Sequence, residues 1–293
     1  MAFVSKFPMA VAVSVLLVGA SLVAFLSKGL NYGVDFRGGA EVMVGFSQPL
    51  ALSDLREGLS KSGFGSSQVQ KIGASEKNEF LIKVSAGESD LNAVTDKLTN
   101  LLTTEFSSAG AEILKTDIVG PKAGESLRIS GFQAMAWALL MIMIYIALRF
   151  DYKYSPGAIV ALLHDVIIII GVFVLTQKEF SLQIVGALLA VIGYSVNDTV
   201  VVYDRVRELE QRNPSLSMGE QINSALNETL SRTILTSLTT LIVSLVMYFM
   251  GGGIIQDFFF AISLGVFIGT YSSIFVAAPT ILFFDKYVLK NAQ

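Results

Sequence analysis

The chain has no cysteine and a single histidine among its 293 residues, and few of its residues carry charge. Without cysteine it can form neither a disulfide framework nor a thiolate metal site. One histidine excludes a metal centre built from several imidazoles. Charged residues make up only 15% of the chain, whereas about 25% is usual for a soluble domain. With 53% hydrophobic residues, this composition is typical of a membrane protein.

Several functional signatures are also missing. The net charge is −3 and the basic residues are scattered, so the chain lacks the clustered positive charge that nucleic-acid binding requires. It contains no HExxH, no GxSxG and no P-loop, the motifs of common metalloproteases, serine hydrolases and nucleoside triphosphatases. We therefore expect neither an enzyme nor a bound cofactor.

Six hydrophobic stretches are long enough to cross a bilayer. The first, Pro8 to Leu26, exceeds the h-region of about 7–15 residues in a signal peptide, and Phe25-Leu26-Ser27 is a poor cleavage site. Because Lys6 precedes this stretch, a signal peptide is the alternative, but we predict a retained helix in 1–28. An exported domain (29–128) and a membrane part (129–290) follow. The further spans are predicted at about 129–148, 157–176, 180–203, 232–250 and 258–284, with a cytoplasmic connector at 204–231 that breaks near Asn213-Pro214.

The exported region reads as a small α+β domain. Its apolar alternation predicts four strands, and two amphipathic stretches predict helices, the second of them capped by Ser89. A polar turn, Glu76-Lys77-Asn78, joins the two middle strands. The resulting βαββαβ order is the ferredoxin-like arrangement. The predicted strands are Glu41–Phe46, Val69–Ile72, Phe80–Val84 and Ile113–Val119.

The short loops predict the orientation. Lysine and arginine are enriched after the second, fourth and sixth spans, where Arg149, Lys153, Arg205, Lys286 and Lys290 are found. The loop after the third span has only Lys178, and the turn after the fifth has no basic residue. Since basic loops stay in the cytoplasm, we expect both termini inside and the small domain outside.

Ionisable residues interrupt three of the spans. Asp198 follows Asn197 and precedes Thr199 in the fourth span, and His164 and Asp165 lie about eight residues into the third. A carboxylate at the bilayer centre costs about 2.5–3.5 kcal/mol on insertion scales, so such residues are functional by default. Arg232 opens the fifth span at a compatible depth, and an Asp198–Arg232 pair would offset part of that cost.

Each polar feature also has a structural interpretation. The hydroxyl residues from Thr233 to Ser244 can bond their own helix carbonyls or a neighbouring helix. Arg232 can extend to the cytoplasmic surface, and His164 can be a packing hydrogen bonder. The Gly265-xxx-Gly269 pair in the sixth span predicts close helix packing. For Asp198 the favoured hypothesis is a proton relay. The membrane potential would supply the energy for a movement, since one charge crossing 100 mV releases about 2.3 kcal/mol.

Four stretches in order resemble the SecD/SecF family of bacterial protein-export membrane proteins, in its SecF form. They are GVDFRGGAEV from Gly33, ALLHDVIIIIG from Ala161, GYSVNDTVVVYDRVRE from Gly193 and SRTILTSLTT from Ser231. The resemblance covers nearly the whole chain and implies an α-helical polytopic membrane protein. Its six transmembrane helices would form one half of a resistance–nodulation–division transporter, with a ferredoxin-like exported domain.

The resemblance also implies partners and site residues. Such a chain pairs with SecD and associates with SecYEG in the bacterial inner membrane, with SecA and a YajC-type accessory subunit as further candidate partners. It uses the proton-motive force to promote preprotein translocation after the ATP-driven SecA step. The family's proton-conducting aspartate and arginine fall on Asp198 and Arg232. Asn197, Thr199, Asp165 and His164 are candidate neighbours.

Two alternatives stay open on the sequence. The chain could be half of a small-solute exporter of the same superfamily, although about 100 exported residues with few aromatics leave little room for a ligand cavity. The GVDFRGGAEV stretch could be a structural link between the first helix and the exported domain, or it could couple movement of that domain to the membrane part.

Overall fold

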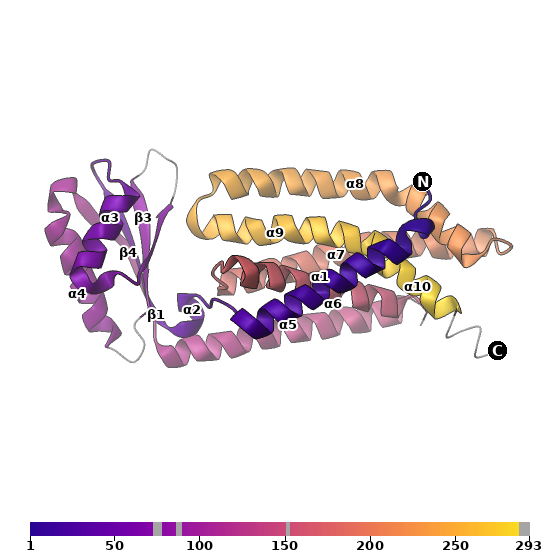
Figure 1. Ribbon diagram of the computed structural model, residues 1–293, viewed down its shortest axis with the longest axis horizontal. Helices are drawn as coiled ribbons and strands as arrows, with labels where there is room; N and C mark the ends of the chain where they lie inside the picture. The colour runs from indigo at the N-terminus through magenta and orange to yellow at the C-terminus, as the bar shows by residue number, and fades with distance from the viewer. Residues whose placement is uncertain (73–77, 86–89, 151–152, 287–293) are drawn as a thin grey trace.

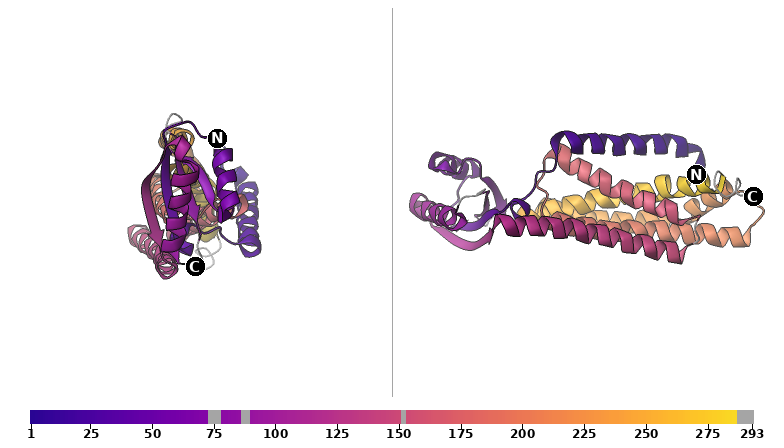
Figure 2. Two further views of the ribbon diagram at one scale, coloured as in Figure 1. Left: turned by 90° about the vertical axis from the view of Figure 1, so that its left-hand side faces the viewer. Right: turned by 90° about the horizontal axis from the view of Figure 1, so that it is seen from below.

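The computed structural model describes residues 1–72, 78–85, 90–150 and 153–286, which form a long helical bundle with a small domain at one end (Figures 1 and 2). The N-terminus and the end of the last helix both lie at the opposite end of the bundle from the small domain (Figure 1). The predicted cap Ser89, the predicted turn residues Glu76 and Lys77, and Lys290 fall outside the described residues.

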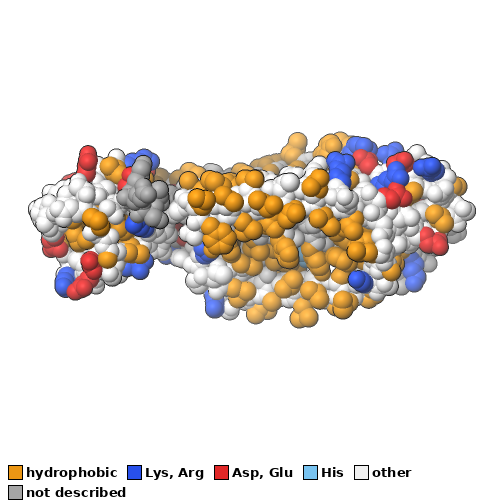
Figure 3. All heavy atoms as spheres, turned by 90° about the horizontal axis from the view of Figure 1, so that it is seen from above, with side chains coloured by type: hydrophobic (Ala, Val, Ile, Leu, Met, Phe, Trp, Pro, Cys, Tyr) orange, Lys and Arg blue, Asp and Glu red, His pale blue; other side chains and the backbone are white. Residues whose placement is uncertain are grey.

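Among the described residues, six helical segments are long and apolar enough to cross a membrane, in agreement with the six predicted spans. Hydrophobic side chains dominate the middle of the molecule, and charged side chains gather at its two ends (Figure 3). The sixth segment combines α9, a π-helical turn (Ser273–Ala277) and α10 (Ala278–Phe284). The long helices are α1 (Phe7–Lys28), α5 (Pro121–Arg149), α6 (Ser155–Thr176), α7 (Leu182–Arg212), α8 (Met218–Met250) and α9 (Gly253–Ser272).

Several helices extend beyond the predicted apolar spans. Helix α5 begins at Pro121, inside the region assigned to the exported domain, while α7 and α8 run through most of the predicted connector and break only between Arg212 and Met218. Hydropathy marks where a helix leaves lipid, whereas backbone hydrogen bonding continues into polar sequence. Helix α8 starts at a capping box, in which Ser217 and Glu220 bond each other's backbone N–H groups.

The small domain has the predicted ferredoxin-like βαββαβ order. Its antiparallel sheet has the strand order β2-β3-β1-β4, the split βαβ arrangement. Helices α3 and α4 cover one face, where Leu55, Leu98 and Leu102 are fully buried against Val42 and Val44. The elements are β1 (Gly39–Phe46), α3 (Leu52–Leu59), β2 (Gln68–Ile72), β3 (Glu79–Val84), α4 (Leu91–Glu105) and β4 (Ala111–Val119).

The cap of α4 is one residue from the predicted position. Asp90 precedes the helix, and its carboxylate accepts a hydrogen bond of 3.0 Å from the Asn92 N–H. A four-residue helix, α2 (Val34–Arg37), lies in the GVDFRGGAEV stretch between α1 and β1. This stretch therefore belongs to the junction between the bundle and the small domain (Figure 1).

Glycines let the helices of the bundle approach closely. A Cβ atom on Gly265 would lie 2.9 Å from the Val191 Cβ, and one on Gly269 would lie 3.0 Å from the Ser195 Cβ. Both neighbours belong to α7, so the predicted Gly265-xxx-Gly269 packing face is confirmed and its partner is α7. Gly171 of α6 meets Ser21 of α1 in the same way.

We predict that Gly265→Ala destabilises the bundle, because the added methyl must displace Val191. Overpacking of this kind costs about 1–3 kcal/mol. Gly186→Ala is the matched control, since it adds a methyl to α7 where no atom lies within 4 Å, and replacing a helical glycine gains roughly 0.5–1 kcal/mol. The measurement is the free energy of unfolding in detergent micelles; equal effects of the two substitutions would contradict the assignment.

Candidate functional site

A buried polar cluster lies where α6, α7, α8 and α9 meet, within the part of the bundle that crosses the membrane. Hydrogen bonds form one group around Asp165 and one around Asp198, and Thr199 and Ser273 bond each other. Its members, each less than a tenth exposed, are His164, Asp165, Ser195, Asp198, Thr199, Thr233, Ser237, Ser272 and Ser273.

Asp165 is held by three neighbours. The hydroxyls of Ser195 and Ser272 donate to its Oδ2 at 2.6 and 2.8 Å, and the His164 Nδ1 lies 2.9 Å from its Oδ1. The carboxylate is only 1% exposed. Since α6, α7 and α9 each contribute a group, this aspartate ties three helices together at one point.

His164 connects the Asp165 group to α1. The centroid of its ring lies 6.1 Å from that of the Tyr271 ring, with 25° between the ring planes, and the Tyr271 hydroxyl donates to the Ala10 carbonyl of α1 at 2.7 Å. The His164 Nε2 has no hydrogen-bond partner among the described residues. It borders a mostly apolar cavity of about 500 Å³ between α1 and α6, so one nitrogen of the ring is bonded and the other is available.

Asp198 is held much more loosely. It is 3% exposed, and its single hydrogen bond within the described residues is a long one, 3.4 Å from the Ser237 hydroxyl of α8. Ser237 also bonds Thr270 of α9 at 2.6 Å and accepts from the Tyr194 hydroxyl at 3.3 Å. An ionised carboxylate has about four acceptor positions, so most of those of Asp198 lack a donor from the described chain.

Asp198 and Arg232 lie at similar positions along neighbouring helices. Asp198 lies about 24 Å along α7 from Leu182, and Arg232 about 27 Å along α8 from Met250, at a rise of about 1.5 Å per residue. Their depths therefore match, as predicted. However, no ion pair joins them among the described residues, and both Arg232 and Asn197 are exposed on the bundle surface. The sequence indicated matching depths for the two residues and left open whether their side chains touch.

Hydroxyl groups of the sixth segment lie beside both aspartates. Ser272 bonds Asp165, Thr270 reaches Asp198 through Ser237, and Ser273 bonds Thr199 at 2.9 Å. The π-helical turn starts at Ser273, and such turns are frequent at functional sites. The contacts of Thr270 and Tyr194 could not be predicted from the sequence, because a hydroxyl on a helix carries no signal of what it faces.

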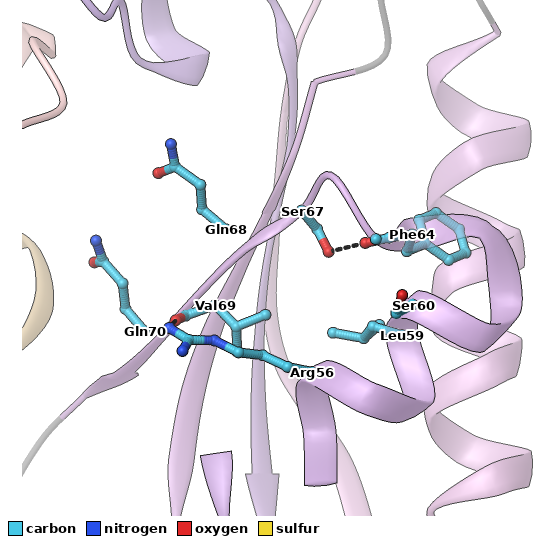
Figure 4. A pocket seen from close by; sticks show the side chains of 9 residues that line it. Arg56, Leu59, Ser60, Phe64, Ser67, Gln68, Val69 and Gln70 are labelled. Atoms are coloured by element: carbon cyan, nitrogen blue, oxygen red, sulfur yellow. Dashed lines mark hydrogen bonds between the residues drawn. The ribbon is translucent and has the colours of Figure 1, made fainter. Parts of the chain in front are cut away.

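A cavity in the small domain has no comparable chemistry. It has a volume of about 610 Å³ and lies between α3 and the edge strand β2 (Figure 4). The Arg56 guanidinium there donates to the Val69 carbonyl at 3.1 Å, and the Ser67 hydroxyl bonds the Phe64 carbonyl. Its polar groups thus stabilise the local fold, and the buried cluster of the bundle is the better functional site.

We predict that Ser195→Ala destabilises the bundle by about 1.5–3 kcal/mol, the range for hydrogen bonds to charged groups. Ser263→Ala is the matched control, because the buried Ser263 hydroxyl donates to another neutral hydroxyl, that of Ser244, at 2.9 Å. Its loss is expected to cost about 0.5–1.5 kcal/mol. The free energies of unfolding of the two variants are compared in micelles. Equal losses would contradict a stronger hydrogen bond from Ser195 to Asp165 than from Ser263 to Ser244.

Family comparisons agree with this architecture. Residues 99–287 match the family described as protein export membrane protein SecD/SecF, C-terminal, and residues 23–50 match the SecD/SecF GG motif. The protein translocase subunit SecF of Desulfurispirillum indicum is 42% identical over 97% of this chain and 93% of its own length. That of Vibrio alginolyticus is 36% identical over 92% of this chain and 85% of its own.

Solved structures show the same fold. The crystal structure of SecDF, a translocon-associated membrane protein from Thermus thermophilus, has a TM-score of 0.83 and 34% identity. The similarity covers 97% of this chain but 38% of the SecDF chain. SecDF in its super-membrane-facing form has a TM-score of 0.74, 35% identity, and is matched over 100% of this chain and 40% of its own. On this evidence the chain belongs to the SecF family of protein translocase subunits.

Proposed function

We propose that this chain works with SecD to convert proton flow across the bacterial inner membrane into movement of preproteins through SecYEG, after the ATP-driven work of SecA. In this role it is a transport subunit and catalyses no covalent reaction of its own. Asp198 is the proposed proton-carrying group, Arg232 is its electrostatic partner, and Asn197, Thr199, Asp165 and His164 are neighbours that position it.

The main support for this proposal is that the two buried aspartates differ in their hydrogen-bond partners. Asp165 has partners on three helices, whereas Asp198 has one long hydrogen bond. A proton can be added to Asp198 without disrupting a network of donors, and this property suits a group that must change its charge in each cycle. Thr233, one turn from Ser237, has a buried hydroxyl without a partner among the described residues, which offers a water molecule a place nearby.

The positions of Arg232 and Asn197 support a partner on this side of the bundle. Both are exposed in the single chain, although they lie at the depth of Asp198. An exposed arginine at that depth is expensive in lipid. We propose that SecD covers this face and encloses Arg232 near Asp198, so that the relay is completed in the complex.

The proposed orientation places the end with the N-terminus in the cytoplasm. Arg149, Lys153 and Arg205 lie at that end, opposite the small domain, and each forms an ion pair there. The small domain then lies outside the cytoplasm. The polar groups that line the cavity of this domain bond its own backbone, and this does not favour the alternative of a small-solute exporter with a ligand site there.

We predict that Asp198→Asn abolishes the stimulation of preprotein export by a proton gradient in vesicles, because the amide cannot take up and release a proton. Arg232→Ala should reduce the same stimulation strongly. Asp204→Asn is the matched control: it lies on the same helix, but its carboxylate is half-exposed and pairs with Arg149 at 3.1 Å. Gradient-dependent export that persists in both Asp198→Asn and Arg232→Ala would exclude the relay.

We further predict that this chain is recovered as an active translocation factor only with a SecD partner. The measurement is co-purification of the two chains followed by the export assay with each chain alone and with both. Asp198→Asn should leave the co-purification intact, because the side chain is buried within this chain. Full activity of the chain alone would contradict the proposed division of the relay between two subunits.

A further inference from the structure

A second buried ionic cluster lies at the junction between the bundle and the small domain. The Lys83 ammonium of β3 lies 2.8 Å from the Glu179 carboxylate and 3.2 Å from that of Glu41 on β1. The side chains of Lys83 and Glu179 are 7% and 8% exposed, and that of Glu41 is 16% exposed. Glu179 belongs to the short loop between α6 and α7, so this cluster joins the membrane part to the sheet.

Glu179 also contacts the GVDFRGGAEV stretch. Its Oε1 accepts a hydrogen bond from the Val34 N–H at 3.2 Å, and a Cβ atom on Gly33 would lie 2.6 Å from that same oxygen. The backbones of Gly33 and Phe180 are bonded at 2.9 Å. A side chain at position 33 would therefore displace the carboxylate, and this explains the glycine that begins the stretch.

The same stretch contacts two more helix ends. The Asp35 carboxylate accepts from the Leu182 N–H at 3.1 Å, so it caps the first turn of α7 from a distant part of the chain. Gly38 lies against the start of α5, where a Cβ on Gly124 would come within 2.9 Å of the Gly38 nitrogen. Helices α5 and α7 and strand β1 thus all meet at this stretch.

The charges of the cluster make it a strong but sensitive contact. Burial alone would lower the pKa of Lys83, but Glu179 and Glu41 more than offset this effect and raise it. Burial raises the pKa of Glu41 despite Lys83, and Asp35 and Glu179 add to the rise. The other charged residue opposite Glu41 is Asp117 of β4, which is exposed and paired with Lys115. Breaking a buried pair by removing one partner leaves an uncompensated charge.

We propose that the Glu179–Lys83 pair is the joint through which movement of α6 and α7 is transmitted to the exported domain. Glu179 lies between the helices that carry Asp165 and Asp198, in a loop that leaves only five residues between Thr176 and Leu182. A shift of either helix therefore moves the Glu179 carboxylate. Glu179, Lys83 and Asp35 are positioning residues that take no part in proton transfer. The inference rests on the proposed function, which supplies the movement that the joint would transmit.

The absence of cysteine from the chain permits a direct test by spin labelling in the complex with SecD. Cysteines replace Thr116 on β4 and Thr176 at the end of α6 nearer the small domain, and both positions are exposed. Electron–electron double resonance then measures the distance between the two spin labels. The parent should give one narrow distance that shifts when Asp198→Asn imitates the protonated state. Lys83→Met should broaden the distribution and remove the shift.

Two further variants separate the joint from a general loss of folding. Glu179→Gln keeps the hydrogen bond to Val34 but loses the charge, and should broaden the distribution as Lys83→Met does. The double variant should be no broader than Lys83→Met alone, because both changes act on one pair. Lys115→Met is the matched control, since that lysine is exposed and pairs only with Asp117 among the described residues. It should behave as the parent does.

The outcomes for the joint and for the relay are distinct. If Lys83→Met leaves the width of the distance distribution unchanged, the joint is overturned, whatever the effect of Asp198→Asn. The joint is also overturned if Asp198→Asn shifts the label distance fully in a chain that already carries Lys83→Met. If Asp198→Asn does not shift the label distance in the parent and also retains gradient-dependent export, the relay is overturned. A broader distance distribution in Lys83→Met would in that case still support the joint as the contact that holds the two parts together. In the export assay, Lys83→Met should lose the stimulation while gradient-driven proton uptake by the vesicles is kept.

Discussion

The burial of two aspartates inside a lipid-embedded bundle is the constraint on which the rest of the structure depends. Each carboxylate at the bilayer centre costs about 2.5–3.5 kcal/mol on insertion scales, so the surrounding helices must supply donors at short range. Helix α9 does this because Gly265 and Gly269 allow it to lie close to α7. Its hydroxyls then reach Asp165 directly and Asp198 through Ser237.

The two aspartates illustrate how one environment can support two roles. Three neighbours stabilise Asp165, and it links α6, α7 and α9. Asp198 lies one turn beyond Ser195 on α7 but faces α8, where one distant hydroxyl is its only partner in the described structure. The well-bonded carboxylate maintains the packing, while the poorly bonded one is the carboxylate for which we propose the proton-carrying role.

The junction with the small domain, at the other end of the helices, also depends on buried charge. Lys83 and Glu179 are buried, and Glu41 is mostly buried beside them. Buried charge pairs seldom add much stability. They do fix geometry, because only one arrangement satisfies every charge, and this property suits a joint between two parts that must keep their alignment.

The sequence by itself determined the six spans, the βαββαβ order of the small domain, the matching positions of Asp198 and Arg232 along their spans, and the Gly265–Gly269 face. These follow from hydrophobic period, strand alternation and the cost of charge in lipid, which are local properties of the chain. Only the tertiary structure decided that Asp165 is bonded by Ser195 and Ser272, that Arg232 and Asn197 lie on the surface, and that Glu179 reaches Lys83. Those contacts join residues far apart in the chain, and helical periodicity gives the face of a residue but not the neighbour that covers it.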